Sequence, residues 1–273
     1  MLGKLFKFEW KDTYLVGTIS SIVVLVLAVI GAVIFQTNLW EMDFESETAA
    51  AIMETTISFY FIMYMLSIMA MAIVMRYYFF YRYYKNLFTD HGYLMNTLPV
   101  TGSQLLKAKL LVALIWQYIT WIVVYFAIFI LVFGVLSGVA DLSFAEIIDE
   151  FKEIPVELYR EMGEGAPFLF SMMAIILLSP LTEILIMYAA VGIGQLCKKH
   201  KFLISVLILV GLYLARAFLM NLAMIPLNFI LFGVDSVWGF NVGGIIALLA
   251  VIALIIGLWY ANRFFLEKKL NLE

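Results

Sequence analysis

The sequence contains few charged residues. Asp, Glu, Lys and Arg make up only 14% of its 273 residues, whereas 65% are hydrophobic. A soluble domain carries about 25% charged residues. The mean hydropathy of +1.02 agrees with this shortage of polar groups. Such a chain cannot cover a water-facing surface, so part of its solvent is lipid. The composition therefore excludes an ordinary soluble protein and predicts an integral membrane protein.

Residues and motifs for catalysis are also scarce. The single cysteine, Cys197, excludes an internal disulfide. With two histidines and one cysteine, no cluster has metal-ligand spacing. The motifs G-x-x-x-x-G-K-[ST], G-x-S-x-G and H-E-x-x-H do not occur. We therefore expect no enzyme activity, no cofactor or metal in this chain, and no nucleic-acid partner.

Six apolar stretches are long enough to cross a bilayer, which requires about 20 residues in a helix. They cover residues 14–35, 57–79, 111–136, 168–196, 202–223 and 242–260. The first is too long for a signal-peptide core of about 7–15 residues, so we expect it to be retained. We find no internal repeat and no low-complexity linker. The prediction is an all-α polytopic membrane protein with six transmembrane helices in one domain, residues 1–273.

The basic residues lie mostly on one side of these predicted spans. Fourteen of the 17 fall in the N-terminal segment, the second-to-third connection, the fourth-to-fifth connection and the C-terminal tail. The connections on the other side are rich in Asp and Glu. Because basic loops stay in the cytoplasm, the pattern predicts that both termini are cytoplasmic.

The N-terminal segment has two chemically different helical faces. One carries Lys4, Lys7 and Lys11, and another carries Leu2, Phe6 and Trp10. This pattern predicts an amphipathic helix on the inner membrane surface, in contact with lipid head groups. A plain basic flank of the first span is the alternative.

Two segments on the predicted outer side have structure of their own. Ser143 and Glu146 form an S-x-x-E capping box before an apolar-acidic helical pattern, which Pro155 ends or kinks. Its acidic face is either a simple solvated surface or a negative vestibule for cationic material. Residues 224–241 are apolar but contain Pro, Asn, Asp and Gly, which predicts a broken re-entrant or interfacial segment before the sixth span.

Two ionisable residues, Glu183 and Arg216, lie inside predicted spans. Counted along their helices, both are about 20 Å from the short connection between the fourth and fifth spans. A lone charge at that depth costs at least about 2.5–3.5 kcal/mol. We therefore expect an intramembrane ion pair; the alternative is that one of them lines a transport path.

The connection between the second and third spans is longer than a tether needs. Residues 85–110 read KNLFTDHGYLMNTLPVTGSQLLKAKL. Thr101 and Gln104 form a capping box that opens the helix leading into the third span. We expect the apolar residues of this connection to be exposed and to dock onto a partner. They are Leu87, Phe88, Tyr93, Leu94 and Met95.

The string N-L-F-x-D-x-G-Y-L-x-x-T-L-P-V, followed by L-L-x-x-K-L, resembles permease subunits of bacterial ABC transporters of the type-two permease class. Here it runs from Asn86 to Val100 and on to Lys109 and Leu110. The six-span plan, the N-terminal surface helix and the broken segment before the last span are also similar to that class. The resemblance covers nearly the whole chain and identifies the type of subunit better than the substrate.

The resemblance implies a multi-pass exporter subunit in the bacterial cytoplasmic membrane. The second-to-third connection would hold a coupling helix that docks on a separate ABC ATPase subunit, which binds ATP and Mg. The implied coupling residues are Lys85, Leu87, Phe88, Asp90, Gly92, Tyr93 and Leu94. A second copy or a related permease would complete a dimer that works by alternating access.

The sequence leaves the substrate and the dimer type open. Methionine-rich spans suit an amphipathic or apolar substrate, and they suit ordinary packing equally well. The alternative function is a free-standing membrane immunity or sensory protein without transport activity.

Overall fold

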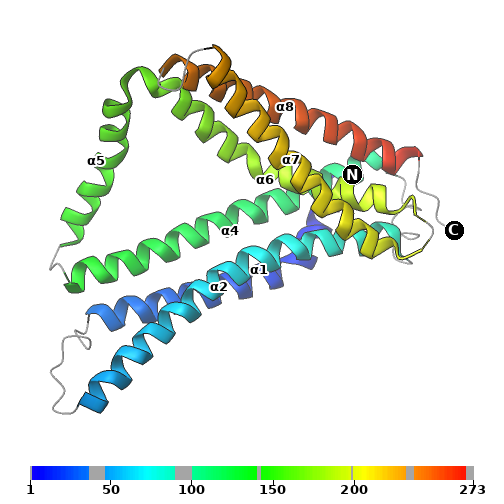
Figure 1. Ribbon diagram of the computed structural model, residues 1–273. Coiled ribbons are helices and arrows are strands. Elements are labelled where there is room, and N and C mark those ends of the chain that lie inside the picture. The colour runs from blue at the N-terminus through cyan, green and yellow to red at the C-terminus, as the bar shows by residue number, and fades with distance from the viewer. Residues whose placement is uncertain are drawn as a thin grey trace. The chain divides into compact units, whose positions relative to one another are not determined.

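The computed structural model consists of long helices (Figure 1). It describes residues 2–36, 47–89, 100–139, 143–197, 199–231 and 237–268. The helices are α1 (Leu2–Gln36), α2 (Glu47–Phe88), α4 (Gly102–Val139), α5 (Phe144–Met162), α6 (Ala166–Gly194), α7 (Lys201–Leu231) and α8 (Val237–Lys268), with a 3₁₀ turn, η1 (Gly163–Gly165). No strand occurs in these described ranges.

Six of these helices, all except α5, are long and apolar enough to cross a membrane. The prediction of an all-α, six-span, multi-pass membrane protein is therefore confirmed at this level. The helices extend beyond the predicted apolar stretches, and α2 continues nine residues past position 79 to Phe88. Such extensions follow because helical hydrogen bonding continues past the apolar stretch wherever no proline or cap stops it.

The expected N-terminal surface helix is not a separate element. Helix α1 runs without interruption from Leu2 to Gln36. The sequence around the expected junction, EWKDTY, has neither glycine nor proline. The backbone hydrogen bonds therefore continue through it. Lys4, Lys7 and Lys11 are exposed, while Phe6 stacks on Trp10 with 5.9 Å between ring centroids.

The amphipathic helix predicted after Ser143 is confirmed as α5. The capping box forms as expected, because the Ser143 backbone N–H donates to Glu146 at 2.8 Å and the Glu146 N–H donates to the Ser143 hydroxyl at 3.4 Å. The expectation that Pro155 could end this helix is wrong, since α5 continues to Met162. Proline removes only one backbone donor, and hydrogen bonds on either side of it can hold the helix together.

The segment expected to be broken before the sixth span is partly helical. Helix α7 continues to Leu231 and α8 begins at Val237. Residues 232–236 lie outside the described ranges.

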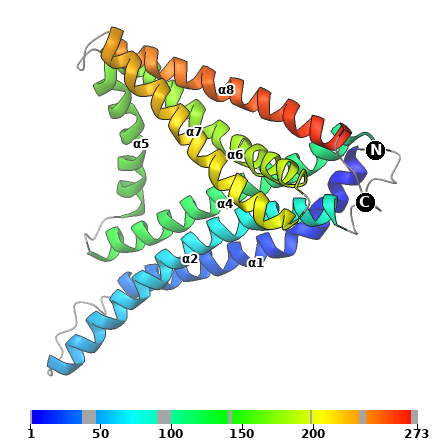
Figure 2. The ribbon, with the colours of Figure 1, turned by 45° about the vertical axis from the view of Figure 1, so that its right-hand side comes forward.

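The residues group into two compact units. The first comprises Met1–Trp10, Arg76–Ile115 and Tyr159–Glu273. In it, α6, α7 and α8 pack against one another, as the two views in Figures 1 and 2 show. The buried Asn262 side chain of α8 donates to the Leu185 carbonyl of α6 at 3.0 Å. This bond joins two helices where apolar contacts alone would allow sliding.

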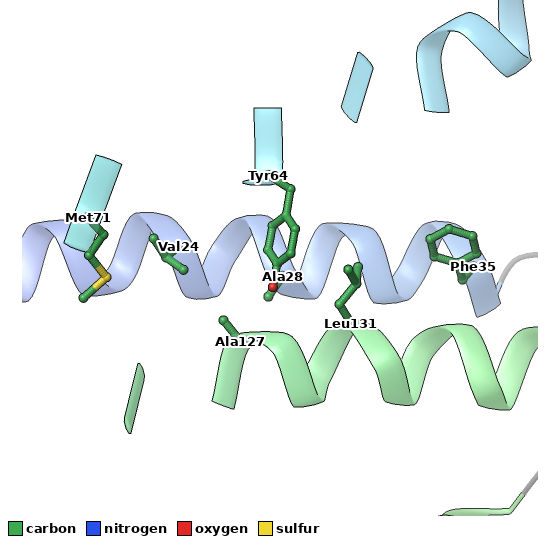
Figure 3. Packing of buried hydrophobic residues seen from close by; sticks show 7 residues of the cluster. All are labelled: Val24, Ala28, Phe35, Tyr64, Met71, Ala127 and Leu131. Carbon is green, nitrogen blue, oxygen red and sulfur yellow. The ribbon is translucent and has the colours of Figure 1, made fainter. Parts of the chain in front are cut away.

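The second unit comprises Lys11–Met75 and Trp116–Leu158. Figure 3 shows its core, formed by Val24, Ala28 and Phe35 of α1, Tyr64 and Met71 of α2, and Ala127 and Leu131 of α4. Gly134 of α4 lies against the Ala32 backbone of α1, so that even a Cβ would overlap it. Small residues at such crossings let membrane helices approach closely.

Candidate functional site

A buried cluster of three charges, all within the first unit, connects parts of three helices. The carboxylate of Glu9, on α1, accepts from Arg82 Nη2 of α2 at 2.7 Å and from Arg82 Nε at 3.1 Å. Its other oxygen lies 2.5 Å from Lys109 Nζ of α4. The exposed fractions of the three side chains are 4%, 9% and 3%. Glu9 therefore bridges α2 and α4 through charge-assisted hydrogen bonds.

Two stacked tyrosines lie beside this cluster. Tyr83 of α2 and Tyr188 of α6 face one another with ring centroids 3.7 Å apart and planes 9° apart. The Tyr188 hydroxyl donates to the backbone carbonyl of Lys109 at 3.3 Å. Both tyrosines line a small pocket together with the three charged residues. The stacking buries both rings against each other, so α6 is attached to the same site.

The cluster lies close to both ends of the α2–α4 connection. Arg82 is six residues before Phe88, the last residue of α2, and Lys109 is seven residues after Gly102, the first of α4. Burying three charges is costly unless each is paired, and removing one partner from a buried pair typically costs about 3–5 kcal/mol. The two stems of the connection are thus fixed to each other and to α1.

Sequence reasoning missed this cluster because it treated Arg82 and Lys109 as cytoplasmic flanking charges. A signal was available in α1. Glu9 begins a stripe of buried, mostly small residues at helical spacing, which continues through Thr13, Gly17, Ser21, Val24 and Ala28. An acidic residue on the buried face of an apolar helix requires a cationic partner.

A second charged cluster joins α2, α6 and α7. Glu183 Oε2 lies 2.6 Å from Arg76 Nη2, and Glu183 Oε1 lies 3.8 Å from Arg216 Nη1. The structure thus brings together the two residues expected to pair, and it adds Arg76, which sequence reasoning had counted as a flanking charge. Arg76 is the nearer partner.

The second cluster is only partly buried. The side-chain exposures are 36% for Arg76, 16% for Glu183 and 20% for Arg216. One carboxylate therefore faces two guanidinium groups, which leaves a net positive charge in this cluster.

The residues predicted to couple to an ATPase are only partly described. Lys85 is exposed, with Nζ 6.0 Å from the centre of the Tyr81 ring. Phe88 is half-buried, and its ring centroid is 6.1 Å from that of Tyr83. Asp90, Gly92, Tyr93 and Leu94, and with them the expected coupling helix, lie outside the described residues.

The expectation that Leu87 is exposed is wrong. Leu87 is fully buried in the last turn of α2. It follows Phe80 and Tyr83 at helical spacing, and both of these are buried as well. Because α2 extends to Phe88, its apolar stripe continues to pack on its own unit and takes Leu87 with it.

The capping box at the other stem is confirmed. The Gln104 N–H donates to the Thr101 hydroxyl at 3.3 Å, and the Thr101 N–H donates to Gln104 Oε1 at 3.4 Å. Helix α4 therefore has a defined start one residue later, at Gly102.

Comparisons with protein families, curated proteins and solved structures find no match to this chain. The fold and the two clusters define a polytopic α-helical membrane protein in which Glu9 joins the C-terminal part of α2 to the N-terminal part of α4.

Proposed function

We propose that this chain is the transmembrane permease subunit of an ATP-driven exporter. It would move an unidentified substrate across the bacterial cytoplasmic membrane by alternating access, together with a separate ABC ATPase subunit. A second copy or a related permease would form the other half. The motif at residues 86–110 and the six long apolar helices support this proposal.

The observation that carries the proposal is the bridge from Glu9 to Arg82 and Lys109. A connection that receives force from a partner must transmit that force to the two spans it joins. The helix ends on either side of the connection must therefore be rigid. Charge-assisted hydrogen bonds in a buried site hold the two stems in one geometry. A loop that merely joined two spans would need only a few residues and no buried bridge.

The proposed contact surface consists of Lys85, Phe88, Asp90, Gly92, Tyr93 and Leu94. Leu87 is omitted because it is buried within the chain. In this proposal the aromatic side chains are the anchors in a groove of the ATPase, and the charged residues lie at the rim.

Co-purification tests the proposal. The tagged chain should be expressed in its host membrane, extracted in mild detergent and tested for a bound ATPase subunit. In the proposed function an ATPase co-elutes, and the permease stimulates or restrains its ATP turnover. A free-standing immunity or sensory protein would elute without any ATPase, and its deletion would leave export unchanged. That result would overturn the proposal.

A further inference from the structure

We propose that Arg76, Glu183 and Arg216 form a binding site for the acidic head group of an amphipathic molecule in the membrane. The ligand class is a phosphate or carboxylate head group on an apolar tail. This inference goes beyond the proposed function and does not depend on an ATPase, because it concerns this chain and lipid-like ligands alone.

The cluster carries an excess positive charge that a bound anion would balance. Two arginines face a single glutamate at 2.6 and 3.8 Å. Arginine stays protonated under all ordinary conditions, so the excess positive charge cannot be removed by losing a proton. An uncompensated charge in a membrane span is unfavourable. A bound anion would remove that cost.

The donors of the cluster also outnumber its acceptors. Each guanidinium offers five N–H donors, whereas one carboxylate has roughly four lone-pair sites. At 3.8 Å, the Arg216–Glu183 contact is longer than a hydrogen bond. Arg216 thus retains donors for a second acceptor, and the planar guanidinium fork matches both carboxylate and phosphate.

The surroundings favour an amphiphile over a free ion. Arg76 is 36% exposed, and Tyr77, the next residue on α2, is 50% exposed. On α7, Leu219, one turn after Arg216, is 52% exposed. The charges therefore lie beside apolar side chains that could contact an acyl tail.

The position along α2 fits a head group as well. Arg76 is followed directly by an aromatic segment with sequence YYFFYRYY, residues 77–84. Aromatic belts of membrane proteins lie at the level of the lipid head groups. Arg76 directly precedes this aromatic segment, so a long arginine side chain can extend from the apolar part of α2 toward the head-group level.

The binding test uses the purified full chain in a neutral detergent. Native mass spectrometry measures the apparent Kd for phosphatidylglycerol, with phosphatidylcholine as the zwitterionic reference. Arg76→Gln and Arg216→Gln should each weaken phosphatidylglycerol binding about tenfold, the loss expected for one charge-assisted hydrogen bond. Glu183→Gln should tighten it, because it removes the competing carboxylate. Arg263→Gln is the matched control, since Arg263 also pairs with a glutamate, Glu267, at 2.9 Å but is exposed at the end of α8.

The arginine and glutamate substitutions are expected to change affinity in opposite directions, and this distinguishes a binding site from a purely structural cluster. A cluster that only holds the helices together would be damaged by all three substitutions, and Glu183→Gln would then weaken binding or leave it unchanged, which would overturn the proposal. Equal binding of phosphatidylcholine, or displacement of phosphatidylglycerol by inorganic phosphate alone, would also overturn it. If Arg216→Gln does not fold, Arg216→Lys replaces it. Lysine keeps the positive charge but lacks the planar guanidinium group, so we expect a smaller loss of affinity than for Arg216→Gln.

Discussion

Arg76 Nη2 of α2 lies 2.6 Å from Glu183 Oε2 of α6, much closer than Arg216 Nη1 lies to Oε1 of the same carboxylate. The pairing of Glu183 with Arg216 was predicted from their level on neighbouring antiparallel helices. The pairing with Arg76 could not be predicted in this way, because Arg76 is on α2, which does not neighbour α6 in the sequence. Glu183 is thus shared, and the two arginines compete for it.

This sharing predicts unequal effects on stability. Arg76→Gln should lower the free energy of unfolding by about 1–3 kcal/mol, because a short charge-assisted contact is lost. Arg216→Gln should cost less, because its contact is long. Thermal unfolding of the purified variants in one detergent measures both. A larger loss for Arg216→Gln would contradict this ranking.

The charge swap Glu183→Arg with Arg216→Glu should restore little stability. A guanidinium at position 183 would face Arg76, and like charges repel more strongly in a medium of low dielectric. Adding Arg76→Gln to the swap should remove this repulsion and recover part of the stability. A swap that matches the unaltered protein without that third change would show that Arg76 does not contribute.

Glu9→Gln should destabilise the chain by about 3 kcal/mol or more, because it leaves Arg82 and Lys109 buried without their shared carboxylate. Denaturation of the purified protein measures the loss. Glu267→Gln is the control: its carboxylate pairs with Arg263 on an exposed turn, where such pairs contribute little. Similar losses for both variants would refute the importance of burial.

Gly134→Ala should destabilise the protein by about 1–3 kcal/mol through overpacking of α4 against α1. An added Cβ would overlap the Ala32 backbone, which cannot rotate away as a side chain could. Gly211→Ala on α7 is the matched control, because nothing lies within 4 Å of its added Cβ. Thermal unfolding should show lower stability for Gly134→Ala and equal or slightly higher stability for Gly211→Ala.

The capping box of α5 should be sensitive to acid. Hydrogen bonds from the Ser143 hydroxyl and then from its backbone N–H hold the pKa of Glu146 below its ordinary 4.5. A carboxyl with a lowered pKa stabilises the fold above pH 4.5, and this contribution is lost as the pH falls through the folded-state value. Carbon-13 NMR titration of Glu146 should show the lowered pKa. Ser143→Ala should raise it toward 4.5, and Ser143→Thr should preserve it.

The double change Phe88→Ala with Tyr93→Ala tests the proposed coupling surface. Each lost aromatic anchor typically costs an interface about 2 kcal/mol or more. We expect loss of ATPase co-purification and transport, with normal membrane insertion. Tyr159→Ala, an exposed aromatic residue of α5, should leave both unchanged. Unimpaired transport by the double variant would disprove the role of this surface.

Elements with local signals were predictable from the sequence. The six spans follow from continuous apolar stretches, and the helix starts at Thr101 and Ser143 follow from S/T-x-x-E/Q spacing. Helical backbone hydrogen bonds and capping boxes both join residues no more than about four positions apart. Of the two effects predicted for Pro155, an end or a kink, the end does not occur, because the neighbouring hydrogen bonds of α5 outweigh the one donor that proline removes.

The sequence by itself determined that this chain is a six-span helical membrane protein, because only helices satisfy their own backbone polar groups in lipid. Tertiary structure alone decided which charges are solvated and which are paired. Arg82 and Lys109 look like ordinary flanking cations in the sequence, yet both are buried against Glu9, about 70 and 100 residues away along the chain. Leu87 looks like an exposed loop residue, yet it is buried. These outcomes depend on which helix faces meet in space, and helical periodicity gives the faces of one helix but not its neighbours.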